Sequence, residues 1–379
     1  MKYLQSVLIV GGGSAGLTCA CFLRKAGVEV EVSEISHDTD GGAALGLSSN
    51  ALLPLRELGV LDEILANSTP NLFMHVCDAS GNTVVDIARP APEGLGFPVN
   101  VVLTRKELSR ILSTAAQRAG ATLTIGRQVL AINADAQGVS VKFEGGRQGR
   151  YDAVIGADGV GSTVRTLVWG ESGMQSVGEA GWRWLTPARP SVKRGAFYLG
   201  SLGTNLGLFP IPGGQLYAVM GEPIEKGFYS TRENRREDVE RRLKEQFSGG
   251  FARDTLADLP PASQIHFSRY PALLMPKPWY KGRVLLIGDA AHAMPPHSSS
   301  GAAMAIEDGA VLYQELLRAS SWDDGVQAFM ERRWRRVKPV FDMAVDRVRS
   351  STSPQDKTLR DPKTTDKVQT LWKLLLQDY

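Results

Sequence analysis

The sequence predicts a mixed α/β fold, in which a doubly wound parallel sheet is interrupted by a mainly antiparallel sheet and followed by a helical tail. Three observations lead to this prediction. A short apolar run, a glycine cluster and a helical pattern follow one another at the N-terminus. Between about residues 180 and 275, strand-like runs alternate with Gly, Pro and Asn, which is typical of an antiparallel sheet. A buried strand returns at residues 283–287 and leads into another helix, so the parallel sheet is expected to be assembled from separate segments.

The first part of the chain reads as a βαβ unit, the repeating element of doubly wound sheets. Residues 7–10 have a buried-strand pattern, residues 17–26 form a helix that Gly27 ends, and residues 28–33 form a second strand. The later elements follow from the same patterns. Helices are predicted over residues 52–58, 105–119, 236–247, 302–318 and 368–375, and strands over residues 121–125, 129–134, 139–143 and 153–155.

The composition of the chain excludes several classes of protein. Of the 379 residues, 43% are hydrophobic and 22% are charged, which suits a large core and argues against disorder. The formal net charge of +3 is too small to predict nucleic acid or an acidic membrane as a partner. No stretch approaches about 18 uninterrupted apolar residues, so no transmembrane helix is expected. Three cysteines cannot form an extensive disulfide framework, which favours a reducing compartment and a cytoplasmic protein.

A glycine-rich motif of the GxGxxG type joins the first strand to the first helix. Its residues are Gly11, Gly13, Ser14, Ala15 and Gly16. The first glycine allows a tight turn, the second lets a pyrophosphate approach the backbone, and the third lets helix and strand pack closely. The helix N-terminus then offers unpaired N–H groups and a partial positive charge to the phosphates. Since Glu34 ends the next strand, where a carboxylate can hold ribose hydroxyls, the motif predicts dinucleotide binding.

The chain is therefore expected to contain a discontinuous nucleotide-binding domain with a second domain inserted into it. The nucleotide-binding domain comprises residues 1–70, 101–178 and 276–340, the inserted domain residues 71–100 and 179–275, and a C-terminal helical segment residues 341–379.

Two more glycine turns follow buried strands later in the chain. The first, residues 156–162, contains Asp158 and Gly159. The second begins at Gly288 and Asp289 and continues through two prolines into a helix. Alone, each turn is compatible with an ordinary connection between a strand and a helix.

Taken together, the three turns carry a resemblance to a known family. The order GGGSAG, GADGVGSTVR and GDAAHAMPPHSSSG resembles that of the single-component FAD-dependent aromatic hydroxylases, whose type member acts on p-hydroxybenzoate. The resemblance spans about residues 5–335, and the salicylate-type and 6-hydroxynicotinate-type hydroxylases are nearest in pattern. It implies bound FAD, O2 and NADH or NADPH as co-substrates, and a small aromatic or heteroaromatic substrate. The hydroxyl group would be transferred from a flavin C4a-hydroperoxide.

The resemblance also implies roles for single residues. Arg105, in the segment TRKEL, would neutralise pyrophosphate charge, and Asp289 would bond ribitol or ribose hydroxyls of FAD. Asp158 and Gly159 belong to the motif that the family uses for FAD and for the approach of NAD(P)H. A loop before the last long helix would direct backbone N–H groups to the flavin pyrimidine edge. The loop residues implied in this role are Pro296, Ser299, Ser300 and Gly301.

The chain departs from the family pattern in two places, one of which comprises two adjacent residues. Ser299 and Ser300 stand where many relatives carry a glycine-glutamine or alanine-glutamine step before the glycine. Because serine still donates backbone N–H groups, flavin binding is expected to survive, while the pocket wall can differ. Ile35 stands where a polar residue often follows the ribose-binding acid, so contacts on the adenine side are left open.

His297 and Tyr217 are the candidate catalytic residues. His297 lies on the loop expected to face both flavin and substrate, and 6-hydroxynicotinate-type relatives carry a histidine at the matching place. An imidazole there can accept a phenolic proton or hold a substrate oxygen; a loop histidine without a chemical role is the alternative. His292 is expected to be structural. Candidate pocket-lining residues of the inserted sheet are Trp182, Arg183, Trp184, Phe209 and Tyr217, although aromatic residues at strand spacing more often belong to the core.

Other functions stay open at this point. The FAD fold also serves flavin-dependent halogenases and double-bond reductases, and the serine loop is compatible with a non-catalytic flavin-binding protein. A plain NAD-dependent dehydrogenase would carry the first motif without a bound flavin. No metal site is predicted, because the five histidines are scattered along the chain. A monomer or homodimer is expected, with the C-terminal segment capping the fold or forming a dimer contact.

Overall fold

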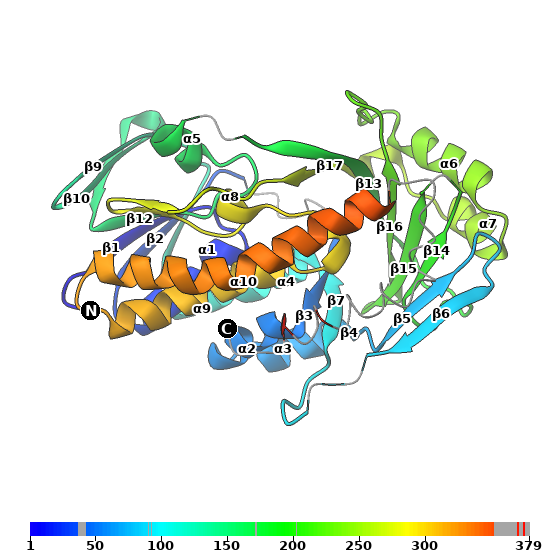
Figure 1. Cartoon of the computed structure of the whole chain (residues 1–379), viewed down its shortest axis with the longest axis horizontal. Helices are drawn as coiled ribbons and strands as arrows, with labels where there is room; N and C mark the ends of the chain where they lie inside the picture. The colour runs from blue at the N-terminus through cyan, green and yellow to red at the C-terminus, as the bar shows by residue number, and fades with distance from the viewer. Residues whose placement is uncertain are drawn as a thin grey trace.

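Two large sheets and the helices that cover them make up the protein (Figure 1). The computed structural model describes residues 1–36, 43–89, 91, 93–170, 173–201, 203–351, 370 and 374–375. Within these ranges no helix is long and apolar enough to cross a membrane. No group of three His, Cys, Asp or Glu side chains in the same ranges is arranged to hold a metal ion.

The first sheet has six strands and is mainly parallel. Its strands are β1 (Ser6–Val10), β2 (Glu29–Glu34), β8 (Thr122–Ile125), β12 (Ala153–Gly156), β18 (Tyr280–Lys281) and β19 (Val284–Leu286). They lie in the order β18-β19-β12-β1-β2-β8, and β18 alone is antiparallel to its neighbour. Val7, Leu8 and Ile9 of β1 are fully buried, as a central strand covered on both faces requires. The predicted parallel sheet built from separate segments is confirmed.

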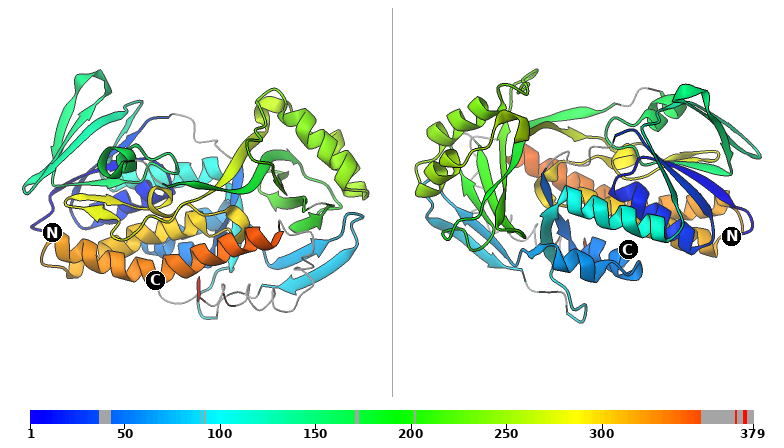
Figure 2. Two further views of the ribbon diagram at one scale, coloured as in Figure 1. Left: turned by 45° about the horizontal axis from the view of Figure 1, so that its top comes forward. Right: turned by 180° about the vertical axis from the view of Figure 1, so that it is seen from behind.

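Helices cover one face of this sheet, and a small antiparallel sheet covers the other (Figure 2). The helical face carries α1 (Ser14–Lys25), which packs between α4 (Arg105–Arg118) and α9 (Gly301–Arg318). On the opposite face lie α5 (Thr163–Trp169) and a sheet of β9 (Val129–Asp135), β10 (Gly138–Phe143) and β11 (Gln148–Tyr151). α5 and β11 were not predicted; each of the other elements named here begins and ends within a few residues of a predicted one.

A single long helix closes the helical face. α10 (Trp322–Ser351) packs along α9, contains Pro339, and reaches the inserted sheet (Figure 1). The predicted division of the chain at residue 340 falls inside this continuous helix. Most of the helix predicted over residues 368–375 lies outside the described residues, which there comprise 370, 374 and 375.

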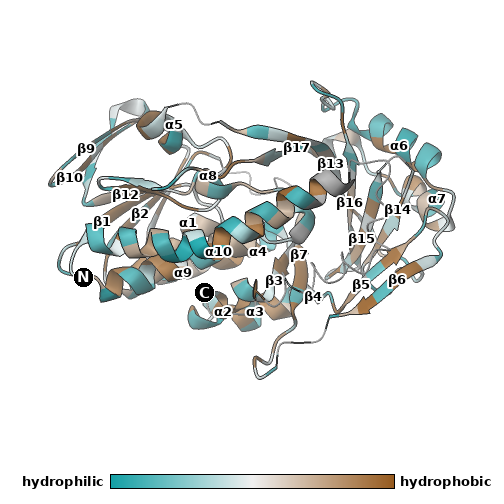
Figure 3. Ribbon diagram, in the orientation of Figure 1, coloured by the Kyte–Doolittle hydropathy of each residue, from teal (hydrophilic) through white to brown (hydrophobic). Residues whose placement is uncertain are grey.

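The second sheet has seven strands and is mainly antiparallel, as predicted. Its strands are β5 (Phe73–Cys77), β6 (Thr83–Ala88), β13 (Gln175–Pro187), β14 (Ala196–Leu199), β15 (Asn205–Ile211), β16 (Gln215–Pro223) and β17 (His266–Ala272). The order is β17-β13-β16-β15-β14-β5-β6, with a parallel pairing between β14 and β5. α6 (Arg235–Gln246) and α7 (Gly250–Ala257) cover its outer face. Figure 3 shows that α6 is largely hydrophilic. Its apolar residues Val239 and Leu243 are buried and supply its contact with the sheet.

The two faces of β13 have different environments, since successive side chains of a strand point to opposite faces. Trp182 and Trp184 are fully buried in the outer core together with Leu243 of α6. The prediction that these two tryptophans line a pocket is therefore wrong, because their neighbour Arg183 takes the inner face. Phe209 and Tyr217 do lie on the inner side, where they form a separate cluster.

A small three-stranded sheet lies at the junction of the two large sheets. It consists of β3 (Ala44–Ser48), β7 (Asn100–Thr104) and β4 (Thr69–Pro70). Along the chain, α2 (Ser49–Glu57) and α3 (Leu61–Ala66) lie between β3 and β4. Ala44 and Val102 pack against Phe209 and Tyr217 on the inner face of the seven-stranded sheet. β3 of this junction also touches the loop of the third glycine turn, since a Cβ at Gly46 would lie 2.9 Å from the Ser299 Oγ.

Candidate active site

The first glycine turn folds tightly enough to exclude side chains. Gly11 has a φ of +109°, and a Cβ there would lie 2.3 Å from the carbonyl oxygen of Ala157. A Cβ at Gly16 would lie 2.0 Å from the carbonyl oxygen of Gly11. Around Gly13, in contrast, nothing lies within 4 Å of the Cβ position, and no side chain caps the start of α1. The first N–H groups of the helix, those of Ser14, Ala15 and Gly16, therefore face an open approach, as a pyrophosphate requires.

The close contact at Gly16 gives a direct test of this turn. We expect Gly16→Ala to abolish retention of FAD, because the new methyl group meets backbone that cannot move aside. The flavin-to-protein ratio after gel filtration measures the effect. Gly173→Ala is the control, since nothing lies within 4 Å of the Cβ position of Gly173. A Gly16→Ala protein that keeps a full complement of FAD would contradict the assignment.

Glu34 is fixed beside the same turn. Its Oε2 accepts a hydrogen bond of 2.7 Å from the N–H of Gly12, and its Oε1 accepts one of 2.9 Å from the N–H of Ser36. The carboxylate is therefore held at the end of β2 next to the glycine backbone. This is the place where the sequence predicts a ribose-binding acid.

The second turn uses its acidic side chain to begin a helix. The Asp158 carboxylate accepts hydrogen bonds from the Ser162 hydroxyl and from the N–H of Val164, which cap α5. Gly159 has a φ of +77°, so the turn favours glycine there. Arg165 donates to the carbonyl oxygens of Val160 and Ala290, at 2.6 and 2.9 Å, and so ties the second turn to the third. The local pattern around Arg165 does not indicate this contact, because Arg165 and Ala290 lie 125 residues apart in the sequence.

Arg105 and Asp289 are available to a ligand. Neither side chain has a hydrogen bond or ion pair within the part of the chain that the structure describes. Burial raises the pKa of the Asp289 carboxyl, and the positive charges of His292 and Arg105 oppose that rise. Surrounding protein and the like charge of Arg183 lower the pKa of Arg105, although its side chain stays open to solvent. An unpaired cation and an unpaired carboxylate thus lie within electrostatic reach of each other.

The loop of the third turn leads into α9 without a side-chain cap. Its residues Pro296 to Ser298 form a short 3₁₀ turn, and Ser299 takes a left-handed conformation with a φ of 52°. The carbonyl oxygen of Ser299 accepts a hydrogen bond from the Ser48 hydroxyl, and a Cβ at Gly46 would lie 2.9 Å from the Ser299 Oγ. No side chain caps the helix at Ser300, so the N–H groups that start at Gly301 remain open to a ligand.

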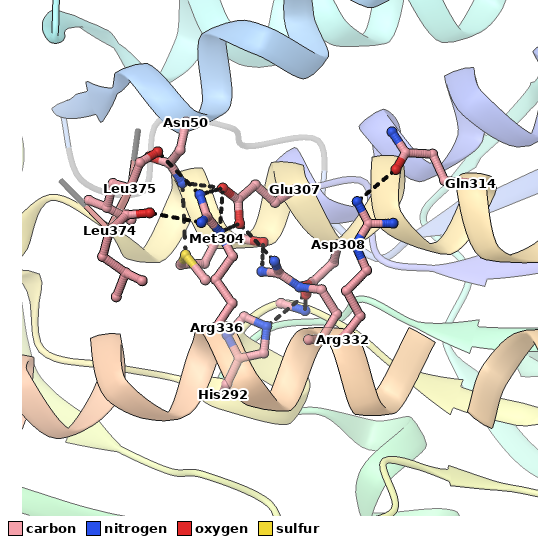
Figure 4. Close-up of polar contacts among 12 residues, drawn as sticks. Asn50, His292, Met304, Glu307, Asp308, Gln314, Arg332, Arg336, Leu374 and Leu375 are labelled. Carbon is pink, nitrogen blue, oxygen red and sulfur yellow. Dashed lines mark hydrogen bonds and ion pairs between the residues drawn. The ribbon is translucent and has the colours of Figure 1, made fainter. Parts of the chain in front are cut away.

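His292 is part of a buried polar network behind this loop, as its structural interpretation requires (Figure 4). Its Nε2 lies 2.7 Å from Oδ2 of Asp308, which also accepts a 2.7 Å hydrogen bond from the N–H of Gly288. Burial alone would raise the pKa of Asp308, but His292 and Arg333 hold it below its ordinary value. The Asp308 carboxylate therefore fixes the backbone of Gly288, the residue that precedes Asp289.

The same network extends through α9 and α10 to the C-terminal segment. Arg333 donates to Asp308 and to Glu307, each at 2.7 Å, and all three side chains are fully buried. Arg336 also binds Glu307 and donates to the carbonyl oxygens of Leu374 and Leu375 (Figure 4). These contacts join the described end of the chain to the helices. Nothing in the sequence pattern alone indicated this network.

His297 pairs with an acid that the sequence did not single out. Its Nε2 lies 2.5 Å from Oε2 of Glu179, a residue of β13 with 2% exposure. Nδ1 of His297 has no hydrogen-bond partner among the described residues. The ring of Tyr270 meets the imidazole edge to face, with the ring centroids 5.7 Å apart. The pair joins the cofactor loop to the inserted sheet across 118 residues of sequence.

Two tyrosines of the inserted sheet, Tyr270 and Tyr217, are also buried. Burial raises the pKa of Tyr270 to about 12, against the opposing charge of Arg183. Burial also raises the pKa of Tyr217, and Arg183 and then Arg105 oppose that rise. Both phenols are therefore neutral hydrogen-bond donors near neutral pH. Tyr217 belongs to β16 and lies within the electrostatic reach of both Arg183 and Arg105.

The residues fit an FAD. An open helix N-terminus, a fixed carboxylate at the end of β2, an unpaired Arg105 and an unpaired Asp289 offer the donors and acceptors that a dinucleotide needs. A second open helix N-terminus at Gly301 suits the flavin ring. The fold and the site thus define a dinucleotide-binding flavoprotein with a separate substrate sheet.

The chain belongs to the FAD binding domain family, which it matches over residues 5–344. It is 30% identical over 319 residues to the 2-heptyl-3-hydroxy-4(1H)-quinolone synthase of Pseudomonas aeruginosa, covering 81% of this chain and 80% of that protein. It is 29% identical over 319 residues to the aurachin C monooxygenase/isomerase of Stigmatella aurantiaca, covering 82% and 80%. HpxO of Klebsiella pneumoniae, solved with FAD and uric acid, has the same fold, with a TM-score of 0.86 at 22% identity over 98% of this chain and 97% of that one. Further relatives are named a putative FAD-dependent monooxygenase, in Bacillus subtilis, and an FAD-dependent urate hydroxylase, in Klebsiella oxytoca. The chain is therefore a flavoprotein monooxygenase, as the resemblance implied.

Proposed function

We propose that the protein hydroxylates a small aromatic or heteroaromatic compound, using O2 and NADH or NADPH. The observation that supports this proposal is the His297–Glu179 pair, which joins the loop before α9 to the inner face of the inserted sheet. A proton acceptor at this place lies where cofactor and substrate meet. The relative from Klebsiella oxytoca is named a urate hydroxylase and the Pseudomonas relative acts in the formation of a hydroxyquinolone, so ring hydroxylation suits this site.

Each residue of the site has a separate proposed role in the reaction. When bound, FAD supplies the redox chemistry: it accepts a hydride equivalent and activates O2 for transfer to an electron-rich ring. His297 accepts the proton of a ring hydroxyl, which raises the electron density of the ring when the oxygen is transferred. Glu179 orients the imidazole and stabilises its protonated form. The neutral Tyr217 donates a hydrogen bond to a substrate oxygen, and the buried inner face keeps water from the reaction.

The cofactor-binding residues are each proposed to contact a different part of FAD. Arg105 is proposed to meet the pyrophosphate, Glu34 the ribose and Asp289 the ribitol, while the backbone of Pro296, Ser299, Ser300 and Gly301 holds the flavin ring. Asp158 and Gly159 act by shaping the turn beside the N-terminal glycines, since the Asp158 carboxylate is already engaged with α5.

Absorbance and turnover test the proposal together. We expect the purified protein to show the flavin spectrum and to oxidise NADH or NADPH slowly on its own. A panel of hydroxylated benzoates, pyridines, quinolones and polycyclic phenols is then added. One class should stimulate oxidation strongly and yield a product heavier by one oxygen. A flavin that is reduced at one slow rate whatever is added would contradict the proposal and favour a reductase or a non-catalytic flavoprotein.

A further inference from the structure

The backbone of Ser299 is strained. Ser299 follows the short turn Pro296–Ser298 with a φ of 52° and a ψ of 27°, the left-handed conformation. Among the residues that the structure describes, Ala43 is the one other non-glycine residue with a positive φ. A side chain crowds the backbone in this conformation, so serine costs free energy there that glycine does not. Such strain persists only where the surrounding structure holds it.

The side chain of Ser299 rests on the strand β3. A Cβ at Gly46, in the middle of β3, would lie 2.9 Å from Oγ and 3.1 Å from Cβ of Ser299. The next atom that this Cβ would meet is Nδ2 of Asn100, at 3.6 Å, which is an ordinary van der Waals distance. Since the φ of Gly46 is not positive, the backbone of β3 would accept a side chain there. The contact with Ser299 is therefore what requires glycine at position 46.

Ser48 holds the same turn through its hydroxyl. Gly46 and Ser48 lie two residues apart on β3, so they point to the same face of the strand. Ser48 is the N-cap residue of α2, a position where serine usually accepts a hydrogen bond from an N–H group of its own helix. No such bond forms here, and the hydroxyl donates instead to the carbonyl oxygen of Ser299, at 3.3 Å. One face of β3 thus contacts both the side chain and the backbone of Ser299.

The loop before α9 is anchored on two sides. His297 is paired with Glu179 of the inserted sheet, and Ser299 is held by β3. The N-terminus of α9, which no side chain caps, begins at Gly301, two residues beyond Ser299. Because so few residues separate them, the position of these open N–H groups depends on the conformation in which Ser299 is held.

We propose that Ser299 is a positioning residue for the flavin, and that its contact with Gly46 sets where the loop backbone meets the pyrimidine edge. The inference rests on the proposed role of this loop in holding FAD. The side chain of Ser299 fills the space that Gly46 leaves open in β3, and this contact keeps the left-handed turn from relaxing. The two residues act as a pair, so a change that disturbs one is compensated by a matching change in the other.

Three variants of the FAD-loaded protein test this pairing without any turnover. Gly46→Ala should weaken FAD binding by about tenfold and shift the visible absorbance bands of the flavin, because the new methyl group displaces Ser299. Ser299→Gly alone should shift the bands, because the loop loses its contact with β3. The double variant Gly46→Ala/Ser299→Gly should bind FAD more tightly than Gly46→Ala, since both atoms that the methyl group would meet are gone. The control Gly173→Ala, which introduces no contact within 4 Å, should leave both measurements unchanged.

Two results would overturn the inference: a Gly46→Ala protein whose FAD affinity and absorbance bands equal those of the unchanged protein, or a double variant that stays as impaired as Gly46→Ala. If Gly46→Ala does not fold, Ser299→Gly decides alone: shifted flavin bands support the positioning role, and unshifted bands contradict it. Because substrate is absent throughout, a failed pairing leaves hydroxylation to its own test. A confirmed pairing in a protein that never oxygenates a ring would count against the proposed function alone.

Discussion

Replacing His297 by Gln is expected to lower the substrate-dependent kcat by about a hundredfold or more, the usual contribution of a positioned general base. The glutamine keeps a polar side chain next to Glu179 but cannot take up a proton from a ring hydroxyl. The measurement is the rate of product formation at saturating substrate and NAD(P)H. FAD content should not change, because the loop is proposed to hold the flavin through backbone groups alone, and the Ser48 contact to Ser299 also fixes its structure.

Glu179→Gln provides the partner experiment, since Glu179 acts through His297. We expect a smaller loss of kcat than in His297→Gln, because the imidazole remains. The loss should appear in kcat, because the imidazole remains but no longer has the carboxylate that lies 2.5 Å from its Nε2 and orients it. A kcat that is unchanged in His297→Gln, or a loss in Glu179→Gln as large as that in His297→Gln, would contradict the assigned roles.

Replacing Arg333 by Met is expected to cost about 3–5 kcal/mol of the free energy of unfolding, which urea titration of the holoenzyme measures. Arg333 is fully buried, and its removal leaves the buried carboxylates of Glu307 and Asp308 short of a counter-charge. Since Asp308 also holds the N–H of Gly288, the variant should release FAD more readily.

Arg335→Met is the matched control on the same helix. The Arg335 side chain is 82% exposed, and its ion pair with Glu331 spans 3.9 Å at the surface. Such a pair contributes little to stability, so the urea midpoint should not move. Equal midpoints for Arg333→Met and Arg335→Met would show that the buried network does not stabilise the fold.

Local sequence patterns were sufficient to predict much of the fold. The turn at Gly11 and Gly16 was predictable because steric exclusion within a short segment depends on adjacent residues alone. The strands and helices of the parallel sheet were predictable for the same reason. The continuity of α10 was not, because Pro339 and the polar residues around it resemble a helix end, and packing along α9 overrides that local signal.

The candidate site was predicted in part. His297 stood out through its position in the loop, but its partner Glu179 lies 118 residues away, and only the pairing of distant strands brings the two together. Trp182 and Trp184 were candidate lining residues because the sequence pattern did not show that β13 is one continuous strand, whose alternation directs both side chains to the outer core. The ion network of Glu307, Arg333 and Arg336 depends on the docking of α10 on α9, which no local pattern encodes.

Turnover under ¹⁸O2 tests the central claim most directly. The enzyme is incubated with NADH or NADPH and the substrate that most stimulates oxidation, and the product is weighed by mass spectrometry while hydrogen peroxide is assayed in parallel. The account predicts a product with a single ¹⁸O atom and one NAD(P)H consumed for each hydroxylation. A product without the label, or O2 that is converted entirely to hydrogen peroxide, would contradict it.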